Sequence, residues 1–210
     1  MSADPVANSL QTVRDVRLVL ASSSLYRREL LERFGLPFAW RAPDIDETPH
    51  AGELPLGLVR RLALAKTRTL AAAFPAGLII GSDQVAVIAG QALGKPGSEA
   101  RAITQLEAVS GRTVRYLTSV CLLDAASRAF EIEVVSSDVR FRHLHPQRIR
   151  NYVRRERPFD CAGSFKCEGL GIALFEAISA DDPTALIGLP LIALAAMLAR
   201  AGLDILSDLP

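Results

Sequence analysis

The chain has few cysteines and histidines, the residues that build zinc centres and disulfide frameworks, and its net charge is small. Its 210 residues include three cysteines, three histidines and one tryptophan, and its formal net charge is +1. Cys121, Cys161 and Cys167 are odd in number and lack metal-type spacing, and no two of them form a Cys-x-x-Cys redox pair. The histidines show no zinc spacing with cysteine or glutamate. A reducing cytoplasm is the simplest setting for such a chain.

The charge balance and the apolar runs argue against two classes of partner. The 24 basic residues nearly match the 23 acidic ones, so we expect neither specific nucleic-acid binding nor a membrane partner. No apolar run reaches the length of a membrane span, because Gly188 and Pro190 interrupt the stretch 186–198. Residues 1–16 lack the apolar core of a signal peptide. We expect a loose leader over 1–16 and a single domain over 17–210.

Short apolar segments alternate with helical patterns, which is typical of an α/β fold. The expected strands span 17–21, 38–42, 77–81, 85–88, 91–93, 114–124, 131–141 and 172–178. The expected helices span 24–34, 56–74, 98–109, 146–154 and 191–201. Segments 114–124 and 131–141 predict a long β-ribbon, which could support a homodimer. Because the ribbon adds antiparallel pairing, the sequence predicts a mixed sheet with flanking helices.

A strand, a serine turn and a helix start near the N-terminus form the first candidate site. Leu18 to Ala21 predicts a buried strand, three serines follow, and Arg27 and Arg28 lie in the first helical turn. The free N–H groups of a helix start attract anions, and guanidinium groups match phosphate oxygens. An ordinary capped helix with solvated arginines is the alternative. Two adjacent arginines directly after a buried strand favour a polyphosphate site.

Carboxylates after the strand 77–81 form the second candidate site. Asp83 is expected at the carboxyl edge of the sheet, where open α/β folds bind ligands. A carboxylate there could hold Mg²⁺ or act as a general base on water. Glu47, in the acidic loop 44–49, would complete a Mg²⁺ site with Asp83 and substrate phosphates. The alternatives are a turn aspartate at 83 and a solvated loop at 44–49.

Two lysines are candidates for neutralising phosphate charge. Lys66 lies among small and apolar neighbours, and Lys95 lies in the turn Gly94-Lys95-Pro96. For either one alone, a solvated surface lysine is the ordinary interpretation. The chain contains neither a Gly-x-x-x-x-Gly-Lys-Ser/Thr loop nor a Gly-x-Ser-x-Gly elbow.

Taken in order, these stretches resemble the Maf family of nucleoside triphosphate pyrophosphatases. The matching pieces are Leu20-Ala21-Ser22-Ser23-Ser24 with Arg27-Arg28, Asp44 to Pro49, Leu64-Ala65-Lys66, Gly81-Ser82-Asp83-Gln84, Gly94-Lys95-Pro96, Ser110-Gly111-Arg112, Ala162-Gly163-Ser164-Phe165 and Ile187-Gly188-Leu189-Pro190. The ordered set covers about 16–206 and is specific. The resemblance implies cleavage between the α- and β-phosphates, a divalent cation such as Mg²⁺ or Mn²⁺, and a cytoplasmic setting. It also implies a fold like that of the inosine-triphosphate pyrophosphatases, with a long bent mixed sheet and two lobes around a cleft.

Within the family, the chain is similar to the 7-methyl-GTP branch. That branch pairs Asp-Gln where this chain has Asp83-Gln84, has an aromatic residue at the position of Tyr26, and has a glutamate at the position of Glu168. The dTTP/UTP branch would show Asp-Thr in place of Asp-Gln. Leu25 replaces a common proline and Thr67 a common alanine, and neither departure removes a functional side chain.

The three branch residues suit a 7-methylated guanine, whose ring carries positive charge. An aromatic face such as that of Tyr26 attracts a cation by about 0.5–2 kcal/mol. Glu168 could accept hydrogen bonds from guanine N1–H and the 2-amino group, and Gln84 could contact a base edge or the sugar. The ordinary alternatives are a packed tyrosine, a surface glutamate and a structural glutamine.

The sequence therefore predicts a metal-dependent pyrophosphatase for 7-methyl-GTP, which would keep modified nucleotides out of nucleic acids. Asp83 is the expected general base, and Glu47 and Asp83 are the expected metal ligands. The expected triphosphate ligands are Ser22, Ser24, Arg27, Arg28, Lys66 and Lys95, and the expected base-specificity residues are Tyr26, Gln84 and Glu168. Two alternatives stay open: a dTTP/UTP or broad nucleotide pyrophosphatase, and a non-catalytic nucleotide-binding regulator of cell division.

Overall fold

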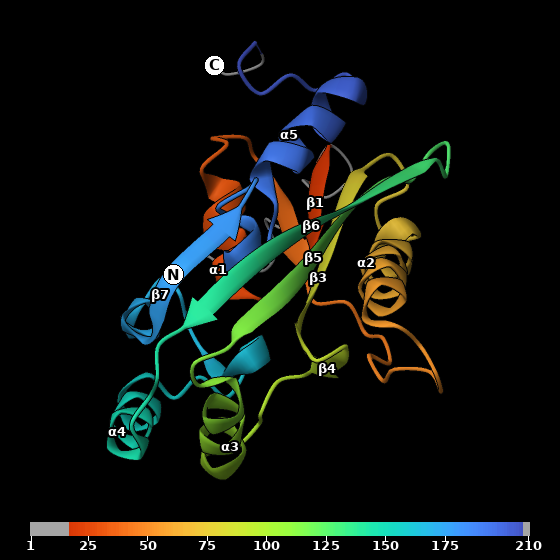
Figure 1. Ribbon diagram of the computed structural model, residues 1–210. Helices are drawn as coiled ribbons and strands as arrows, with labels where there is room; N and C mark the ends of the chain where they lie inside the picture. Colours follow the sequence, from red (N-terminus) through yellow and green to blue (C-terminus); the bar gives the residue numbers. More distant parts are fainter. Residues whose placement is uncertain (1–16, 208–210) are drawn as a thin grey trace, which may run out of the picture.

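The centre of the structure, a computed structural model that describes residues 17–207, is a mixed β-sheet (Figure 1). The seven strands of this sheet are β1 (Leu18–Ala21), β2 (Ala39–Arg41), β3 (Leu78–Ile88), β4 (Gln91–Leu93), β5 (Thr113–Asp124), β6 (Phe130–Phe141) and β7 (Phe175–Ala180). Their order is β2-β1-β3-β5-β6-β7, and β4 pairs with β3. β1 is parallel to β2 and β3, and the other pairs are antiparallel. The predicted mixed α/β fold and the β5–β6 ribbon are confirmed; the expected leader lies outside the described residues.

Two of the helices, α1 (Leu25–Glu32) and α3 (Glu99–Val109), begin at serines that cap them. The others are α2 (Pro55–Ala71), α4 (Pro146–Glu156) and α5 (Leu191–Arg200), with 3₁₀ turns η2 (Ala162–Ser164), η3 (Leu170–Leu174) and η4 (Ala185–Ile187). Ser24 caps α1 by accepting from Arg27 N, and Ser98 caps α3 in the same way. No helix in the range 17–207 is long and apolar enough to cross a bilayer.

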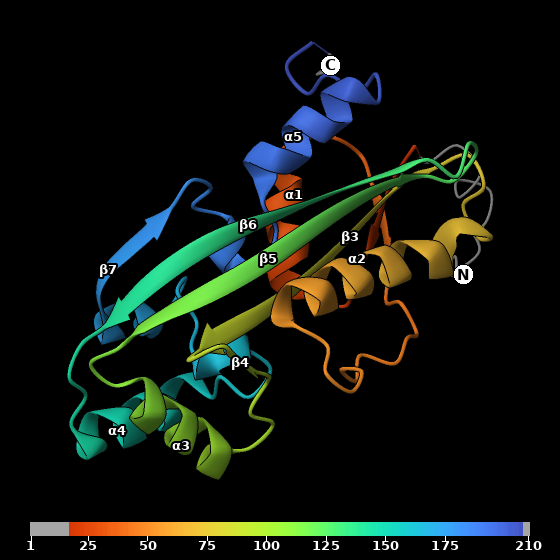
Figure 2. The ribbon, with the colours of Figure 1, turned by 45° about the vertical axis from the view of Figure 1, so that its right-hand side comes forward.

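The apolar side chains pack in three clusters around the sheet. Alternate residues of β1 point to opposite faces: Leu18 and Leu20 pack with α1 and α5, and Val19 and Ala21 pack with α2. Figure 2 shows α2 on one side of the strands and α1 and α5 on the other. The third cluster joins α3 and α4 to the far end of the ribbon. Four aromatic residues in it, Tyr116, Phe141, Phe165 and Phe175, make edge-to-face contacts with centroid distances of 4.8–5.9 Å.

β3 differs from the prediction, because it is one continuous strand of 11 residues and not two short segments. The ladder with β5 continues through the expected break, with Asp83 opposite Ser119. The parallel neighbour β1 ends opposite Gly81. Asp83 therefore lies in the middle of its own strand, just beyond the carboxyl end of β1. β7 also begins later than expected, because residues 170–174 form η3.

Gly81 lets α2 lie directly against β3. A Cβ atom at this position would lie 2.3 Å from Ala63 O and 2.7 Å from Thr67 Cγ2, both on α2. The first contact is with backbone, so it cannot be relieved by a side-chain rotation. A side chain at position 81 would force α2 away from the sheet.

We expect Gly81→Ala to lower the free energy of unfolding by about 1–3 kcal/mol, as overpacking commonly does. Gly57→Ala is the control, because a Cβ there meets only Glu53 Cγ at 3.8 Å and alanine favours helix. Urea denaturation of both variants measures the difference. Equal stability of the two would contradict a close contact between α2 and β3.

Candidate active site

A cavity of about 630 Å³ opens beyond the carboxyl end of β1. Its wall comes from the β1–α1 turn, the loop before α2, α2 itself, β3, the turn at Gly94 and the loops around Cys161 and Gly188. The predicted site residues that line it are Ser22, Ser24, Tyr26, Arg27, Glu47, Lys66, Asp83, Gln84, Lys95 and Glu168. The fold thus brings together residues that are scattered over most of the sequence.

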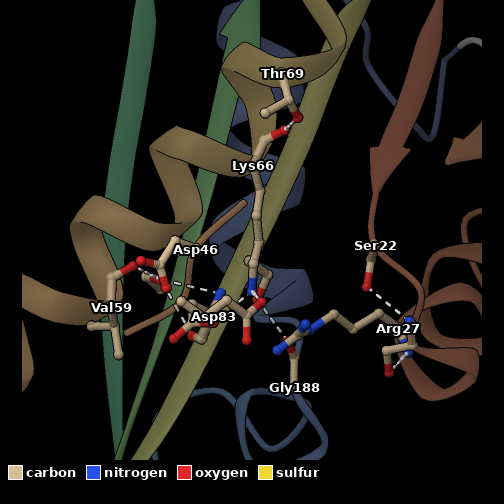
Figure 3. A network of polar contacts seen from close by, with 12 residues as sticks. Ser22, Arg27, Asp46, Val59, Lys66, Thr69, Asp83 and Gly188 are labelled. Atoms are coloured by element: carbon tan, nitrogen blue, oxygen red, sulfur yellow. Dashed lines mark hydrogen bonds and ion pairs between the residues drawn. The ribbon is translucent and has the colours of Figure 1, made fainter. Parts of the chain in front are cut away.

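Lys66 joins the two predicted metal ligands at the buried end of the cavity. Its Nζ donates to Asp83 Oδ1 at 2.6 Å and lies 2.8 Å from Glu47 Oε1. Figure 3 shows the lysine reaching from α2 to Asp83 on β3, with Arg27 beside the carboxylate. Lys66 and Asp83 are both buried, at 4% and 7% exposure. Each buried charge is therefore compensated by an opposite charge at hydrogen-bond distance.

Glu47 is held in its ionised form by the same group of cations. Partial burial of Glu47 raises its pKa, but the hydrogen bond to Lys66 and the positive charges of Lys66, Lys95 and Arg27 lower it. The net result is a pKa below the ordinary value for glutamate. Glu47 is thus a carboxylate at neutral pH, able to accept hydrogen bonds or to contact a cation.

The serine turn is organised by its own hydroxyl groups. Ser22 Oγ accepts from Ser24 N at 3.0 Å, and Ser24 Oγ accepts from Arg27 N at 3.4 Å. Each hydroxyl proton is left to donate toward the cavity, because both bonds use the oxygen as acceptor. Donation by these serines to phosphate oxygens stays a prediction.

Arg27 is fixed by a backbone carbonyl far along the chain. Its Nε donates to Gly188 O at 2.8 Å, and Ser82 Oγ donates to the same oxygen at 2.7 Å. Burial lowers the pKa of Arg27, and Asp83 and Glu47 partly oppose this effect; an arginine stays protonated all the same. The contact through Nε leaves the terminal nitrogens of the guanidinium to meet an anion in the cavity.

Arg28 does not reach the cavity, contrary to its predicted role as a triphosphate ligand. Its guanidinium carbon lies 4.0 Å from the centre of the Trp40 ring, and its buried Nε makes no hydrogen bond with the described residues. Successive helical residues point about 100° apart. The side chains of the two adjacent arginines therefore leave α1 in different directions, and of the two it is Arg27 that lines the cavity.

Tyr26 and Glu168 lie on the cavity wall away from the Lys66 group. Tyr26 is partly buried, which raises its pKa, and the Lys166 ammonium lies 6.0 Å from its ring centre. Glu168 is exposed and accepts a weak hydrogen bond from Cys167 Sγ at 3.4 Å. This part of the cavity offers the ring of Tyr26 and the exposed carboxylates of Glu168 and Asp160 to a ligand.

Gln84 is bound to the protein by its amide nitrogen. Nε2 lies 2.9 Å from Thr118 Oγ1, 2.9 Å from Ala185 O and 3.0 Å from Leu186 O. All three partners can accept a hydrogen bond, so the NH₂ group is used to hold η4. Only Oε1 is left for a ligand, and it can only accept. Gln84 thus has a structural role, which was the alternative to contact with the nucleoside.

Several buried polar residues that support the site were not singled out from the sequence. Ser119 Oγ donates to Val59 O on α2 at 2.7 Å, and Thr118 Oγ1 donates to Ala185 O at 2.9 Å. Asp182 accepts from Thr184 N and Ile192 N and so fixes the loop that carries Gly188. The available signal was the polar pair Thr118-Ser119 directly before the apolar run Val120 to Leu123 of β5.

The donor set suits a cation that arrives with its substrate. Within residues 17–207, no group of three or more histidine, cysteine, aspartate or glutamate side chains could hold a metal. Glu47 and Asp83 nevertheless converge on one ammonium group. Mg²⁺ commonly binds through one or two carboxylates together with waters and substrate phosphates, so this pair fits such an ion.

Comparisons with known proteins place the chain among proteins of one family. A profile of the family described as Maf-like protein matches residues 17–201. The "7-methyl-GTP pyrophosphatase" of Pseudomonas aeruginosa is 54% identical over 188 residues, which cover 90% of this chain and 98% of that protein. The protein of the same name from Nitrosococcus oceani is 54% identical over 189 residues, which cover 90% and 95%.

One solved structure, that of the Staphylococcus aureus Ham1 protein, matches with a TM-score of 0.44 and 14% identity over 60% of this chain and 71% of that one. The family profile, by contrast, matches nearly the whole described chain, and the two relatives align over most of its length. The chain therefore belongs to the Maf family.

Proposed function

We propose that the chain hydrolyses 7-methyl-GTP to 7-methyl-GMP and pyrophosphate. The observation that carries this proposal is the meeting of Asp83, Glu47, Lys66 and Arg27 at one end of a cavity that Tyr26 and Glu168 also line. Relatives that are 54% identical and bear the name 7-methyl-GTP pyrophosphatase support the choice of substrate.

Asp83 is the group best placed to activate water. Lys66 holds Oδ1, which fixes the carboxylate plane, and Oδ2 makes no hydrogen bond with any residue in the described part of the chain. As water attacks the α-phosphorus, Oδ2 takes its proton and the bond between the α-phosphorus and the bridging oxygen breaks. Pyrophosphate then leaves with the electron pair of that bond.

The cations of the cavity stabilise the charge that builds on the phosphates. Arg27 is oriented through Gly188 O before any ligand binds, so no reorganisation is needed when charge develops. Lys95, on the exposed turn, adds a mobile positive charge. A divalent cation such as Mg²⁺ or Mn²⁺, held by Glu47 and Asp83 together with the phosphates, would neutralise further charge.

The nucleobase is recognised by charge as well as by shape. The Tyr26 ring offers a π-face to the positively charged methylated guanine. Glu168 complements that charge and accepts from the base. Gln84 Oε1 accepts from a further donor of the nucleoside. A cytoplasmic setting belongs to this proposal, and three free cysteines agree with it; the homodimer stays a prediction.

The proposal predicts release of monophosphate and pyrophosphate with Mg²⁺, fastest from 7-methyl-GTP among 7-methyl-GTP, GTP, dTTP, UTP and ITP. Chromatography of the products measures this. The matched control is Asp83→Asn, which keeps the shape of the side chain but removes the carboxylate base. We expect this variant to lose at least 10²-fold in kcat and to retain nucleotide binding. Fastest turnover of dTTP or UTP would favour the pyrimidine alternative. Binding without any product would favour the non-catalytic regulator.

Arg27 and Arg28 are adjacent but have different surroundings, so their variants should differ. We expect Arg27→Gln to lower kcat/KM by about 10²–10³-fold, as loss of a charge-stabilising donor commonly does. Arg28→Gln should change kcat/KM by less than about threefold, since the residue does not line the cavity. Steady-state kinetics with 7-methyl-GTP measure kcat/KM of both variants. Equal losses in both variants would place Arg28 in the phosphate site.

Glu168→Gln keeps the size of the side chain and removes its charge. We expect kcat/KM for 7-methyl-GTP to fall about 10-fold or more, because a charged hydrogen-bond partner is lost, and that for GTP to fall less. The measurement is the ratio of the two kcat/KM values. Glu32→Gln, an exposed change on α1, should leave the ratio unaltered. An unchanged ratio in Glu168→Gln would remove Glu168 from specificity.

A further inference from the structure

A strongly basic segment lies outside the cavity, on α4 and the residues before it. Between positions 140 and 157 the chain has seven arginines, no lysine and a single acidic residue, Glu156. Since the whole chain has a net charge of only +1, the remainder of the molecule is net negative. The surplus of positive over negative charge is therefore concentrated in this segment.

Most of these arginines have no acidic partner. All seven are exposed, and Arg140 pairs with Glu176 at 3.0 Å. Within the described range 17–207, no carboxylate lies at ion-pair distance from the other six: Arg142, Arg148, Arg150, Arg154, Arg155 and Arg157. We call these six the basic face.

The acidic groups nearby do not neutralise the basic face. Glu156 accepts from Leu170 N at 3.2 Å and lies against Gly169, so it is turned toward η3. Glu99 on α3 shares a shallow groove with Arg154 and Arg157 without pairing with either. One exposed glutamate beside six unpaired arginines leaves a large positive surplus.

The arrangement on α4 keeps like charges close together. The helix buries Ile149, Tyr152 and Val153, so its polar side faces solvent. Arg150 and Arg154 are four residues apart, which aligns them on that side, and Arg157 follows at the C-cap of the helix. Like charges at this spacing repel each other and destabilise a helix. The dipole at the helix end favours Arg154 and Arg155, but it does not account for Arg142, Arg148 and Arg150.

Other parts of the same end of the molecule extend this surface. Gly111 N donates to Arg142 O, and Phe141 N donates to Arg112 O, both at 2.9 Å, so the exposed Arg112 lies close to the basic face. Figures 1 and 2 show α3 and α4 together beyond the end of the β5–β6 ribbon, away from α2 and α5. Among residues 17–207, the arginines on this side of α4 stay exposed to solvent.

We propose that the basic face binds the phosphate backbone of a nucleic-acid strand, without sequence preference. Guanidinium forks match phosphate oxygens in two hydrogen bonds, and the basic face contains arginine alone. Contacts of this kind position a strand but carry no sequence information. The net charge of +1 alone predicts no nucleic-acid partner. That value is a sum over the whole chain and does not report how unevenly the charges are distributed over the surface.

An anionic membrane is the competing partner, and α4 is poorly suited to it. A helix that lies in a membrane surface buries an apolar face in the lipid, whereas the apolar face of α4 is already buried in the protein core. The neighbouring η3 exposes two large apolar side chains, Leu170 and Ile172, which is a small apolar area for a membrane contact.

The test is fluorescence anisotropy of a labelled 20-nucleotide poly(U) RNA titrated with the full chain at 50 mM salt and over a salt series. We expect binding that weakens steeply with salt. The variant R148Q/R150Q/R154Q/R155Q should bind at least 10-fold more weakly, and its slope of log K against log salt should be smaller by about 3, from about 0.7 per phosphate contact.

A control removes the same charge from exposed positions elsewhere, as R33Q/R60Q/R68Q/R128Q, and should bind RNA within about twofold of the wild type. An unchanged midpoint of thermal unfolding would show that both variants fold. Neither this check nor the RNA titration depends on whether 7-methyl-GTP is a substrate. No RNA binding by the wild type, or equal losses in both variants, would overturn the proposal. Binding to vesicles with 30% anionic lipid but not to RNA would overturn it in favour of a membrane surface.

Discussion

The ion pairs of Lys66 with Asp83 and Glu47 are the constraint on which the rest of the site depends. A buried lysine is costly unless opposite charges lie within hydrogen-bond distance, and here two carboxylates do so. The contact requires α2 to lie directly on β3, which Gly81 permits. It also requires β3 to continue past the end of β1, because Asp83 lies two residues beyond Gly81, the residue opposite the end of that strand. Backbone packing, strand length and charge pairing thus support one geometry.

A second polar network orients Arg27 from the opposite side of the cavity. Asp182 fixes the loop that carries Gly188, and Gln84 and Thr118 hold the carbonyls of η4. Gly188 O then accepts from both Arg27 and Ser82. Arg27, the proposed phosphate ligand near the N-terminus, is therefore positioned by residues about 160 places later in the chain. Any change that loosens η4 should disturb the guanidinium without touching it.

The sequence was informative where a property is local or where a motif set is long. Most strand and helix positions and ten residues of the cavity wall follow from such signals. Properties that depend on partners far along the chain did not follow. Asp83 was expected at the end of a strand because its polar neighbours look like a turn, yet the pairing with β5 keeps them extended. Arg27 and Arg28 are adjacent residues of the same type, and only the directions in which their side chains leave α1 distinguish them. The role of the Gln84 amide depends on η4, a hundred residues later.

The charges on the cavity wall explain why a cation should accompany the nucleotide. Three basic residues line the cavity, Arg27, Lys66 and Lys95, and four acidic residues face them, Glu47, Asp83, Asp160 and Glu168. A triphosphate that enters this space therefore meets no surplus of positive charge, and Lys66 is already engaged by two carboxylates. A divalent cation on the phosphates would supply the missing charge and satisfy those carboxylates at once. Asp83, the base of the proposed mechanism, would then meet an anionic substrate without net repulsion. By this argument Lys66 is a counter-ion for the carboxylate pair as much as a proposed ligand for phosphate, and a cation that arrives with the nucleotide would complete the site.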